Sequence, residues 1–226
     1  MYRWDFGWVW TFRAALLDAL WVTIELNLLI LVFGTIAGFL VWRARASRFR
    51  LLRLSAVAYI DLLRTLPVLV LLVWFFYCVP ILLGGIRLGP MVSAVIVLSL
   101  NLSAFTAEII RAGIDGVPVG HVESARACGL SAHQTLRRIV LPIAFRNMVP
   151  PMVGQYINSV KLSVLASIIA VPELLQKTVD ISSRVYRPLE FYTVLAALFL
   201  LLLLPGTILS RRLEAGEHNR RLTTSG

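Results

Sequence analysis

The stretch VESARACGLSAHQTLRRIVLP, residues 122–142, interrupts a strongly apolar chain with a polar, arginine-rich segment that has the features of two short helices. Pro118 precedes it and suits the first turn of a helix, where a missing N–H costs nothing. Gly129 fits the left-handed position that commonly ends a helix. The spacing therefore predicts a helix over residues 119–128, closed by Gly129.

A second helix is expected directly after this glycine. Ser131 and Gln134 form the Ser-x-x-Gln pattern of a capping box, and Pro142 marks the end of the helix or a kink in it. The segment is too polar to cross a bilayer and too regular to be a slack loop. Such a helix–glycine–helix elbow can rest on anionic lipid headgroups or dock onto a cytoplasmic partner, and the residues alone leave both roles open.

Composition indicates a membrane protein. Of the 226 residues, 58% are hydrophobic, and the mean hydropathy is +0.81, well outside the range of ordinary soluble domains. The net charge of +10 suits nucleic acid, anionic lipid or an acidic partner. The basic residues cluster between apolar runs, which favours the membrane over nucleic acid. The two cysteines lack a metal-ligand pattern, so no metal site is expected.

Five apolar segments are long enough to cross a bilayer as helices: residues 15–42, 54–79, 88–110, 147–171 and 189–210. The predicted fold class is therefore all-α, with residues 1–226 forming one transmembrane domain. Fourteen Lys or Arg residues lie in the loops after the first and third spans and in the tail, against six in the other exposed segments. This bias places the C-terminus and the connection 111–146 in the cytoplasm and the N-terminus outside.

The elbow resembles the EAA loop of the permease subunits of bacterial ABC importers. Glu123-Ser124-Ala125 is followed after three residues by Gly129, and after nine more by Ile-Val-Leu-Pro at 139–142. Every spacing of that motif is present, with Ser124 in place of one alanine. Segments 59–67, 107–120, 170–175 and 186–192 also resemble the polar amino acid branch of this family.

The resemblance implies a multi-pass permease subunit in the bacterial inner membrane, forming half of the pathway of an ATP-driven importer. A second copy or a paralogous permease would form the other half, and two ABC ATPase subunits would bind the elbow. A substrate-binding protein would deliver a polar amino acid, or a derivative such as an opine or a compatible solute. The implied ATPase-coupling residues are Val122, Glu123, Ser124, Ala125, Arg126, Gly129 and Leu130.

The chain has no phosphate-binding loop of its own. Its only lysines are Lys161 and Lys177, and neither follows the required glycine-rich sequence. ATP and Mg²⁺ are therefore expected on partner subunits, and this chain is expected to be a transport subunit without a cofactor, not an enzyme. Segment 172–188 and the turn 80–89 are expected to receive the binding protein, with an ordinary solvated loop as the alternative.

Ionisable residues inside a span are costly, and each is a candidate for function. Gln155, Asn158 and Lys161 recur every three residues in the fourth span, so they share a helix face that should look into the protein or a cavity. Pro150 and Pro151 predict that this span begins with a kink or a re-entrant turn. Two roles stay open for Lys161: a counter-charge to a buried acid, or a contact with substrate.

Residues 161–165 resemble the Lys-Asp-Thr-Ser-Leu sequence of the amino acid branch. Ser163 matches in kind, whereas two polar positions of that sequence are Leu162 and Val164 here. The difference implies another ligand or a larger role for the partner permease. The candidates for the substrate pathway are thus Lys161, Asn158, Gln155, Ser163 and Arg64.

Two further features of the spans give expectations about packing and ion pairs. Arg64 is either a gate or substrate contact or a member of a structural ion pair with Asp61 or Glu108. Gly34 and Gly38 form a Gly-x-x-x-Gly pattern that permits close helix contact.

Two other classes of protein remain as alternatives. A stand-alone secondary transporter would often show an inverted repeat, and none is evident. A membrane scaffold without transport leaves the polar face around Lys161 unexplained.

Overall fold

The computed structural model describes the backbone of residues 2–85 and 88–224 and the side chains up to residue 213. Every regular element in the described part of the chain is helical. In chain order they are α1 (Gly7–Thr11), α2 (Arg13–Arg45), α3 (Arg50–Thr65), α4 (Val68–Leu82), α5 (Pro90–Asp115), α6 (Val119–Ala127), α7 (Ala132–Thr135), η1 (Leu136–Val140), α8 (Leu141–Leu162), η2 (Ser163–Ile169), α9 (Leu174–Val185) and α10 (Pro188–Thr224).

Four helices in the described residues are long and apolar enough to cross a membrane, or five spans if one bent pair counts as a crossing. The bent pair is α3 and α4, which meet at 106°. The span expected over residues 54–79 is therefore not one continuous helix but two helices with a bend between them. Pro67 is the cause, because a residue before proline is held in extended conformation, and Leu66 has a ψ of 134°.

The fourth span begins earlier than the sequence suggested. Helix continues from Ala132 to Ile169, through α7, the π-helical turn η1, α8 and the 3₁₀ turn η2. Pro142 lies in the first turn of α8, where proline is tolerated, so the elbow's second helix does not end there. Pro150 and Pro151 lie inside α8, so the expectation that they open the span was also wrong.

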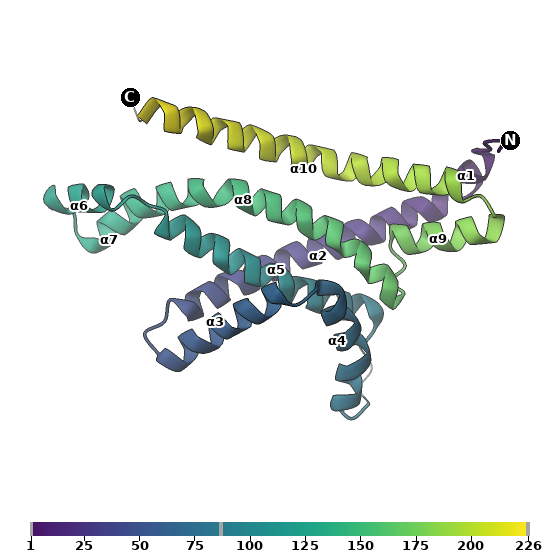
Figure 1. Cartoon of the computed structure of the whole chain (residues 1–226), viewed down its shortest axis with the longest axis horizontal. Coiled ribbons are helices and arrows are strands. Elements are labelled where there is room, and N and C mark those ends of the chain that lie inside the picture. Colours follow the sequence, from purple (N-terminus) through teal and green to yellow (C-terminus); the bar gives the residue numbers. More distant parts are fainter. Residues whose placement is uncertain (1, 86–87, 225–226) are drawn as a thin grey trace.

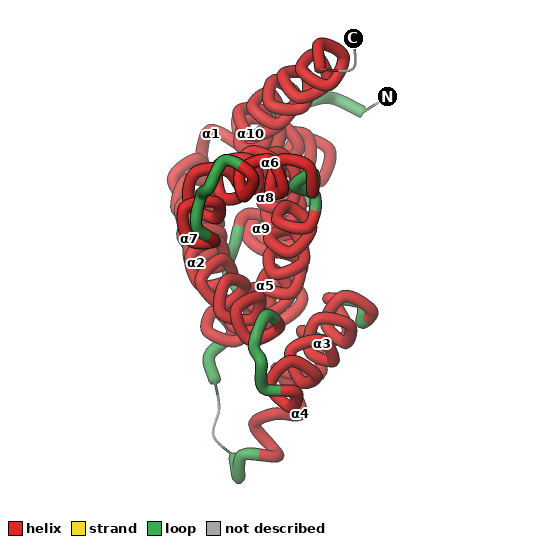
Figure 2. Tube along the Cα trace, turned by 90° about the vertical axis from the view of Figure 1, so that its left-hand side faces the viewer, coloured by secondary structure: helices red, strands yellow, loops and turns green. Residues whose placement is uncertain are grey.

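The helix ends divide the molecule into two poles. Figure 1 shows α6, α7 and the C-terminus at one pole, and the N-terminus, α1 and α9 at the other, with α2, α5, α8 and α10 running between them. Figures 1 and 2 both place α10 and the α3–α4 pair on opposite sides of the α2–α5–α8 group. Only 6% of the apolar 18-residue stretch of α10 is buried, so most of this part of the helix faces away from its own chain.

Helices α2 and α5 pack closely at the Gly-x-x-x-Gly pattern. A Cβ on Gly34 would lie 2.7 Å from Leu102 Cδ2, and a Cβ on Gly38 would lie 2.5 Å from Thr106 Cβ. The expected close contact is confirmed, since only glycine leaves room for α5 at these two positions.

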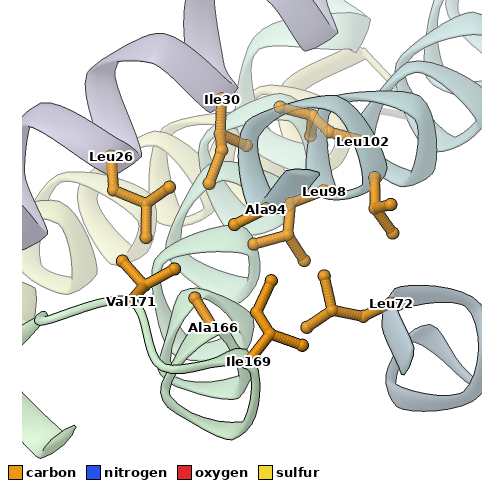
Figure 3. Close-up of a cluster of buried hydrophobic side chains, with 10 residues drawn as sticks. Leu26, Ile30, Leu72, Ala94, Leu98, Leu102, Ala166, Ile169 and Val171 are labelled. Atoms are coloured by element: carbon orange, nitrogen blue, oxygen red, sulfur yellow. The ribbon is translucent and has the colours of Figure 1, made fainter. Parts of the chain in front are cut away.

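A buried apolar cluster fastens α4 and η2 to this pair. Leu26, Ile30, Leu72, Leu102 and Ile169 are among its members, each at most 1% exposed. Figure 3 shows these side chains converging from four parts of the chain. The cluster fixes the end of the α8–η2 helix, and with it the rotation of the polar residues on α8.

Candidate functional site

The elbow at the α6–α7 pole is built by local signals. Leu130 N donates to Ala125 O at 3.1 Å and Gly129 N to Arg126 O at 2.9 Å, the paired bonds of a Schellman motif. Gly129 has a φ of 79°, which glycine adopts without strain. The predicted capping box is present: Gln134 N donates to Ser131 Oγ, and Ser131 N donates to Gln134 Oε1.

Most of the predicted coupling residues form an exposed surface. Glu123, Ser124, Arg126 and Gly129 are exposed, whereas Val122 and Leu130 are half-buried. Ala125 is 6% exposed, so it packs beneath the elbow and is not part of its outer surface.

Val119 was not identified from the sequence, and it is 68% exposed on α6. The sequence did carry a signal for it, because Val119 is an apolar residue that directly follows Pro118 at the start of the predicted polar helix.

A hollow lies behind the elbow, between the end of α5, α6 and the first turns of α8. Its volume is about 710 Å³, and Gly113, Gly116, His121 and Asn147 are among its lining residues. Asn147 Nδ2 donates to Gly113 O at 3.4 Å across it. This bond links α8 to α5 behind the elbow.

An ion-pair network fastens the ends of α2 and α5 beside this pole. Glu108 pairs with Arg45 at 2.5 Å and with Arg111 at 2.5 Å, and Arg111 also pairs with Asp115 at 2.6 Å. Glu108 is thus a member of a structural ion pair, but its partners come from α2 and from its own helix. The sequence missed Arg45 because it lies 63 residues away.

Arg64 and Asp61 do not form the expected pair. Both are exposed, and neither takes part in an ion pair within the described residues. The guanidinium of Arg64 lies instead over the ring of Phe105, with its central carbon 5.4 Å from the ring centroid. Because α3 ends at the Pro67 break, Arg64 lies in its last turn, where its side chain reaches α5.

The polar face of α8 is only partly as expected. Asn158 and Lys161 are exposed on the outside of the single chain, and no ion pair of Lys161 is found among the described residues. Gln155 is half-buried, and its Nε2 has no hydrogen-bond partner in the described part of the chain. Among the side chains that the structure describes, Lys161 therefore has no buried acid to which it acts as a counter-charge.

Ser163 belongs to the interior and not to this face. It is 1% exposed and accepts a hydrogen bond from Asn27 Nδ2 on α2 at 3.0 Å. At about 100° per residue, Ser163 lies roughly 200° around the helix from Lys161. The bond fixes α8 against α2, so Ser163 holds the polar face in place and does not line it.

At the opposite pole, the predicted outer segment 172–188 contains a helix, α9. Glu173 caps it, accepting hydrogen bonds from Leu175 N at 2.9 Å and Gln176 N at 2.8 Å. Glu173 is 1% exposed, and this burial raises the pKa of its carboxyl against the opposing effect of the two backbone bonds. In the other expected docking turn, 80–89, residues 86–87 lie outside the described residues.

Tyr186 ends α9 in the left-handed conformation with a φ of 53°, and its side chain is 86% exposed. The segment therefore contains a helix with a defined start and end and is not an irregular loop.

The spans, the elbow at one pole and the unpaired polar face of α8 together define a helical subunit of a membrane transport system. The model of the family described as "Binding-protein-dependent transport system inner membrane component" matches residues 30–217. The chain belongs to this family, and it is an inner membrane protein.

Several proteins named for amino acid transport are similar to the chain. The glutamine transport system permease protein of Escherichia coli (strain K12) is 29% identical over 94% of this chain and 97% of its own length. The L-cystine transport system permease protein of Bacillus subtilis (strain 168) is 38% identical over 77% and 74%. The octopine transport system permease protein of Rhizobium radiobacter is 32% identical over 97% and 94%.

Two solved structures share the architecture. A crystal structure of an amino acid ABC transporter with histidines contains a chain that superposes with a TM-score of 0.86 at 28% identity, covering 95% of this chain and 99% of that one. An inward-facing form of the MetNI methionine ABC transporter matches with a TM-score of 0.65 at 21% identity over 90% and 98%, which shows the fold alone.

Proposed function

We propose that this chain is the permease subunit of an ATP-driven importer for a polar amino acid or an amino acid derivative, and that it forms half of the translocation pathway. The single observation that carries the proposal is Lys161, a charged residue exposed on the outside of a span with no partner among the described residues. A charge in a span faces protein or water and not lipid. A second permease around a shared polar pathway supplies both.

The chemistry of the α8 face suits an amino acid. The ammonium of Lys161 provides a cation for a carboxylate, and the amides of Asn158 and Gln155 offer both donors and acceptors. The relatives named for glutamine, cystine and octopine support this substrate class. The proposed substrate class includes amino acid derivatives because the relative named for octopine matches almost the whole chain.

The elbow is the proposed coupling site for the ATPase. Its exposed residues Glu123, Ser124, Arg126 and Gly129 form the contact, together with Val119 and the half-buried Val122 and Leu130. A Schellman motif and a capping box make this projection rigid enough to transmit movement into α5 and α8. The excess of basic residues in its loops supports a cytoplasmic location for this pole and an outer location for the N-terminus. In this orientation, a binding protein outside the cell membrane would dock on α9 and the α9–α10 turn.

Mechanistically, the chain works by changing which pole of the pathway is open. ATP-driven closure of two partner ATPases moves the two elbows together and opens the pathway outward. A binding protein then releases substrate towards the α8 faces, and hydrolysis resets the inward-open state. This chain's own residues bind substrate and transmit motion, and the ATP and Mg²⁺ stay on the partners.

Charge reversal at the two poles tests the assignment. Glu123→Lys should abolish co-purification of the ATPase while leaving the chain folded, because Glu123 is exposed and makes no described ion pair. The matched variant Arg184→Glu, exposed on α9 at the other pole, should keep the ATPase but lose stimulation of hydrolysis by loaded binding protein. Equal ATPase capture by both variants and wild type would overturn the coupling role.

Lys161→Met tests the pathway separately in proteoliposomes containing the ATPase and binding protein. The ATPase should remain bound and substrate uptake should be lost, because methionine keeps most of the length of the side chain and removes the charge. Uptake at the wild-type rate would remove Lys161 from the pathway.

A further inference from the structure

The N-terminal arm, residues 2–12, carries aromatic residues at every second position. Tyr2, Trp4, Phe6, Trp8 and Trp10 are all exposed, with exposed fractions from 42% for Trp8 to 70% for Trp10. The rings also contact each other, since Trp4 stacks on Phe6 with centroids 5.7 Å apart. A row of large exposed rings on a segment this short is unusual unless something covers it.

The arm is fixed to the start of α10 by a buried carboxylate. Glu190 is 0% exposed and accepts hydrogen bonds from Tyr2 Oη and, at 2.9 Å, from Asp5 N. Arg187 lies 3.6 Å from Glu190 and donates to Arg3 O at 2.9 Å. These contacts hold the backbone of the arm against α10, and the rings of Trp4, Phe6 and Trp10 stay exposed.

The arm lies at the level where two spans begin. α1 ends at Thr11 and α2 starts at Arg13, so Trp10 is within one turn of a 33-residue apolar helix. The guanidinium of Arg13 lies 4.7 Å from the Trp10 ring centroid, and α10 starts at Pro188 beside the Glu190 contact. Figure 1 shows α1 next to the first turns of α10 at this pole.

We propose that residues 2–12 are an interfacial membrane anchor, whose exposed rings lie among the headgroups and glycerol backbones of the leaflet at this pole. Trp and Tyr favour that layer because each combines an apolar ring with a polar group, and arginine stems reach from it to phosphate. The Glu190 contacts connect this anchor to the α9–α10 turn, so the bilayer surface sets the height of that turn. The anchor depends only on the membrane location of the family, so it can fail without affecting the transport proposal.

Tryptophan quenching tests the anchor in the intact chain. The chain has six tryptophans, and changing Trp21, Trp42 and Trp74 to Phe leaves the three in the arm. In phosphatidylcholine nanodiscs, a nitroxide on the lipid headgroup should quench this emission more than a nitroxide deep in the acyl chain. Iodide in the water should quench it far less than it quenches free N-acetyltryptophanamide.

The opposite pattern, with strong iodide quenching and none by lipid nitroxides, would overturn the anchor and leave a surface for a soluble protein. The link to Glu190 is tested by the substitution Tyr2→Phe. The matched control is Tyr192→Phe, because Tyr192 is also an exposed tyrosine but lies on α10. Tyr2→Phe should raise iodide quenching and lower headgroup quenching, and the control should change neither. Identical quenching in both variants would refute the role of the Tyr2–Glu190 bond.

Discussion

Replacing Gly38 by alanine should weaken the α2–α5 contact, although alanine is the better helix former. The new Cβ would lie 2.5 Å from Thr106 Cβ and 2.9 Å from Ser103 O, whereas packed carbons rest about 3.5–4.0 Å apart. Ser103 O is backbone, so the helices must separate. Overpacking costs about 1–3 kcal/mol, and up to about 1 kcal/mol returns through helix propensity. The net loss should lower Tm by several degrees, at about 2–4 °C per kcal/mol in a chain of this size.

The assay is thermal unfolding in detergent, followed by intrinsic tryptophan fluorescence, with Gly154→Ala as the matched control. Gly154 lies inside α8, and a Cβ there would meet no described atom within 4 Å. The control should therefore unfold at the wild-type temperature or slightly above it. Gly34→Ala should fall between the two, because its three nearest contacts, at 2.7–2.9 Å, are all side-chain atoms of Leu102 and none is backbone. If Gly38→Ala unfolds at the same temperature as Gly154→Ala, the packing argument is refuted.

Three further predictions concern residues around η2 and α9, measured by the same unfolding assay. Ala170→Gly should stabilise the chain by about 1 kcal/mol, because Ala170 has a φ of 61° and glycine adopts this conformation freely. Glu173→Ala should cost about 1 kcal/mol through loss of the α9 cap, and Glu173→Gln less. Burial raises the pKa of the Glu173 carboxyl in the folded chain. The free energy of unfolding of wild type, relative to that of Glu173→Gln, should therefore fall as the pH rises through that pKa. A rise over the same pH range would contradict the burial effect. Ser163→Ala should cost about 1–3 kcal/mol, since Asn27 Nδ2 loses its side-chain acceptor, and an unchanged Tm would contradict this.

The elbow could be predicted from the sequence because its signals are local. Pro118, Gly129 and the Ser131–Gln134 pair each act within four residues, and each forms the structure that its type favours. At its far end, the two alternatives for Pro142 were a helix end or a kink, and the helix does not end there. Pro142 lacks an N–H, but that loss falls at a π-helical turn, where Leu141 N bonds to Leu136 O, so the helix continues into the membrane.

The helix break in the second span had a signal that apolar composition concealed. Residues 54–79 are continuously apolar enough for one span, and the length criterion takes no account of bends. Pro67 carries the information through its effect on Leu66. The same break places Arg64 over Phe105, and the spacing of Asp61 and Arg64 on one helix could not show this.

Long-range partners could not be derived from periodicity. Arg45 and Glu108 meet because Gly34 and Gly38 bring α2 against α5, and the pairing of these two helices is not encoded within either segment. The rotation of α8 could be derived in part. Steps of three residues turn the helix by about 60° each way from Asn158, so Gln155 moves towards the interior while Lys161 stays outside.

The faces of the two exposed spans differ in what can cover them. α10 presents an apolar surface, and lipid satisfies it without any protein. The α8 face presents an ammonium and an amide, and hydrocarbon satisfies neither. In the proposed transporter, Asn158 and Lys161 therefore mark the side that meets the partner permease, and the most hydrophobic helix does not. Because Asn27 and Ser163 hold α8 in this rotation from inside the chain, the single subunit already presents Asn158 and Lys161 on its outer surface.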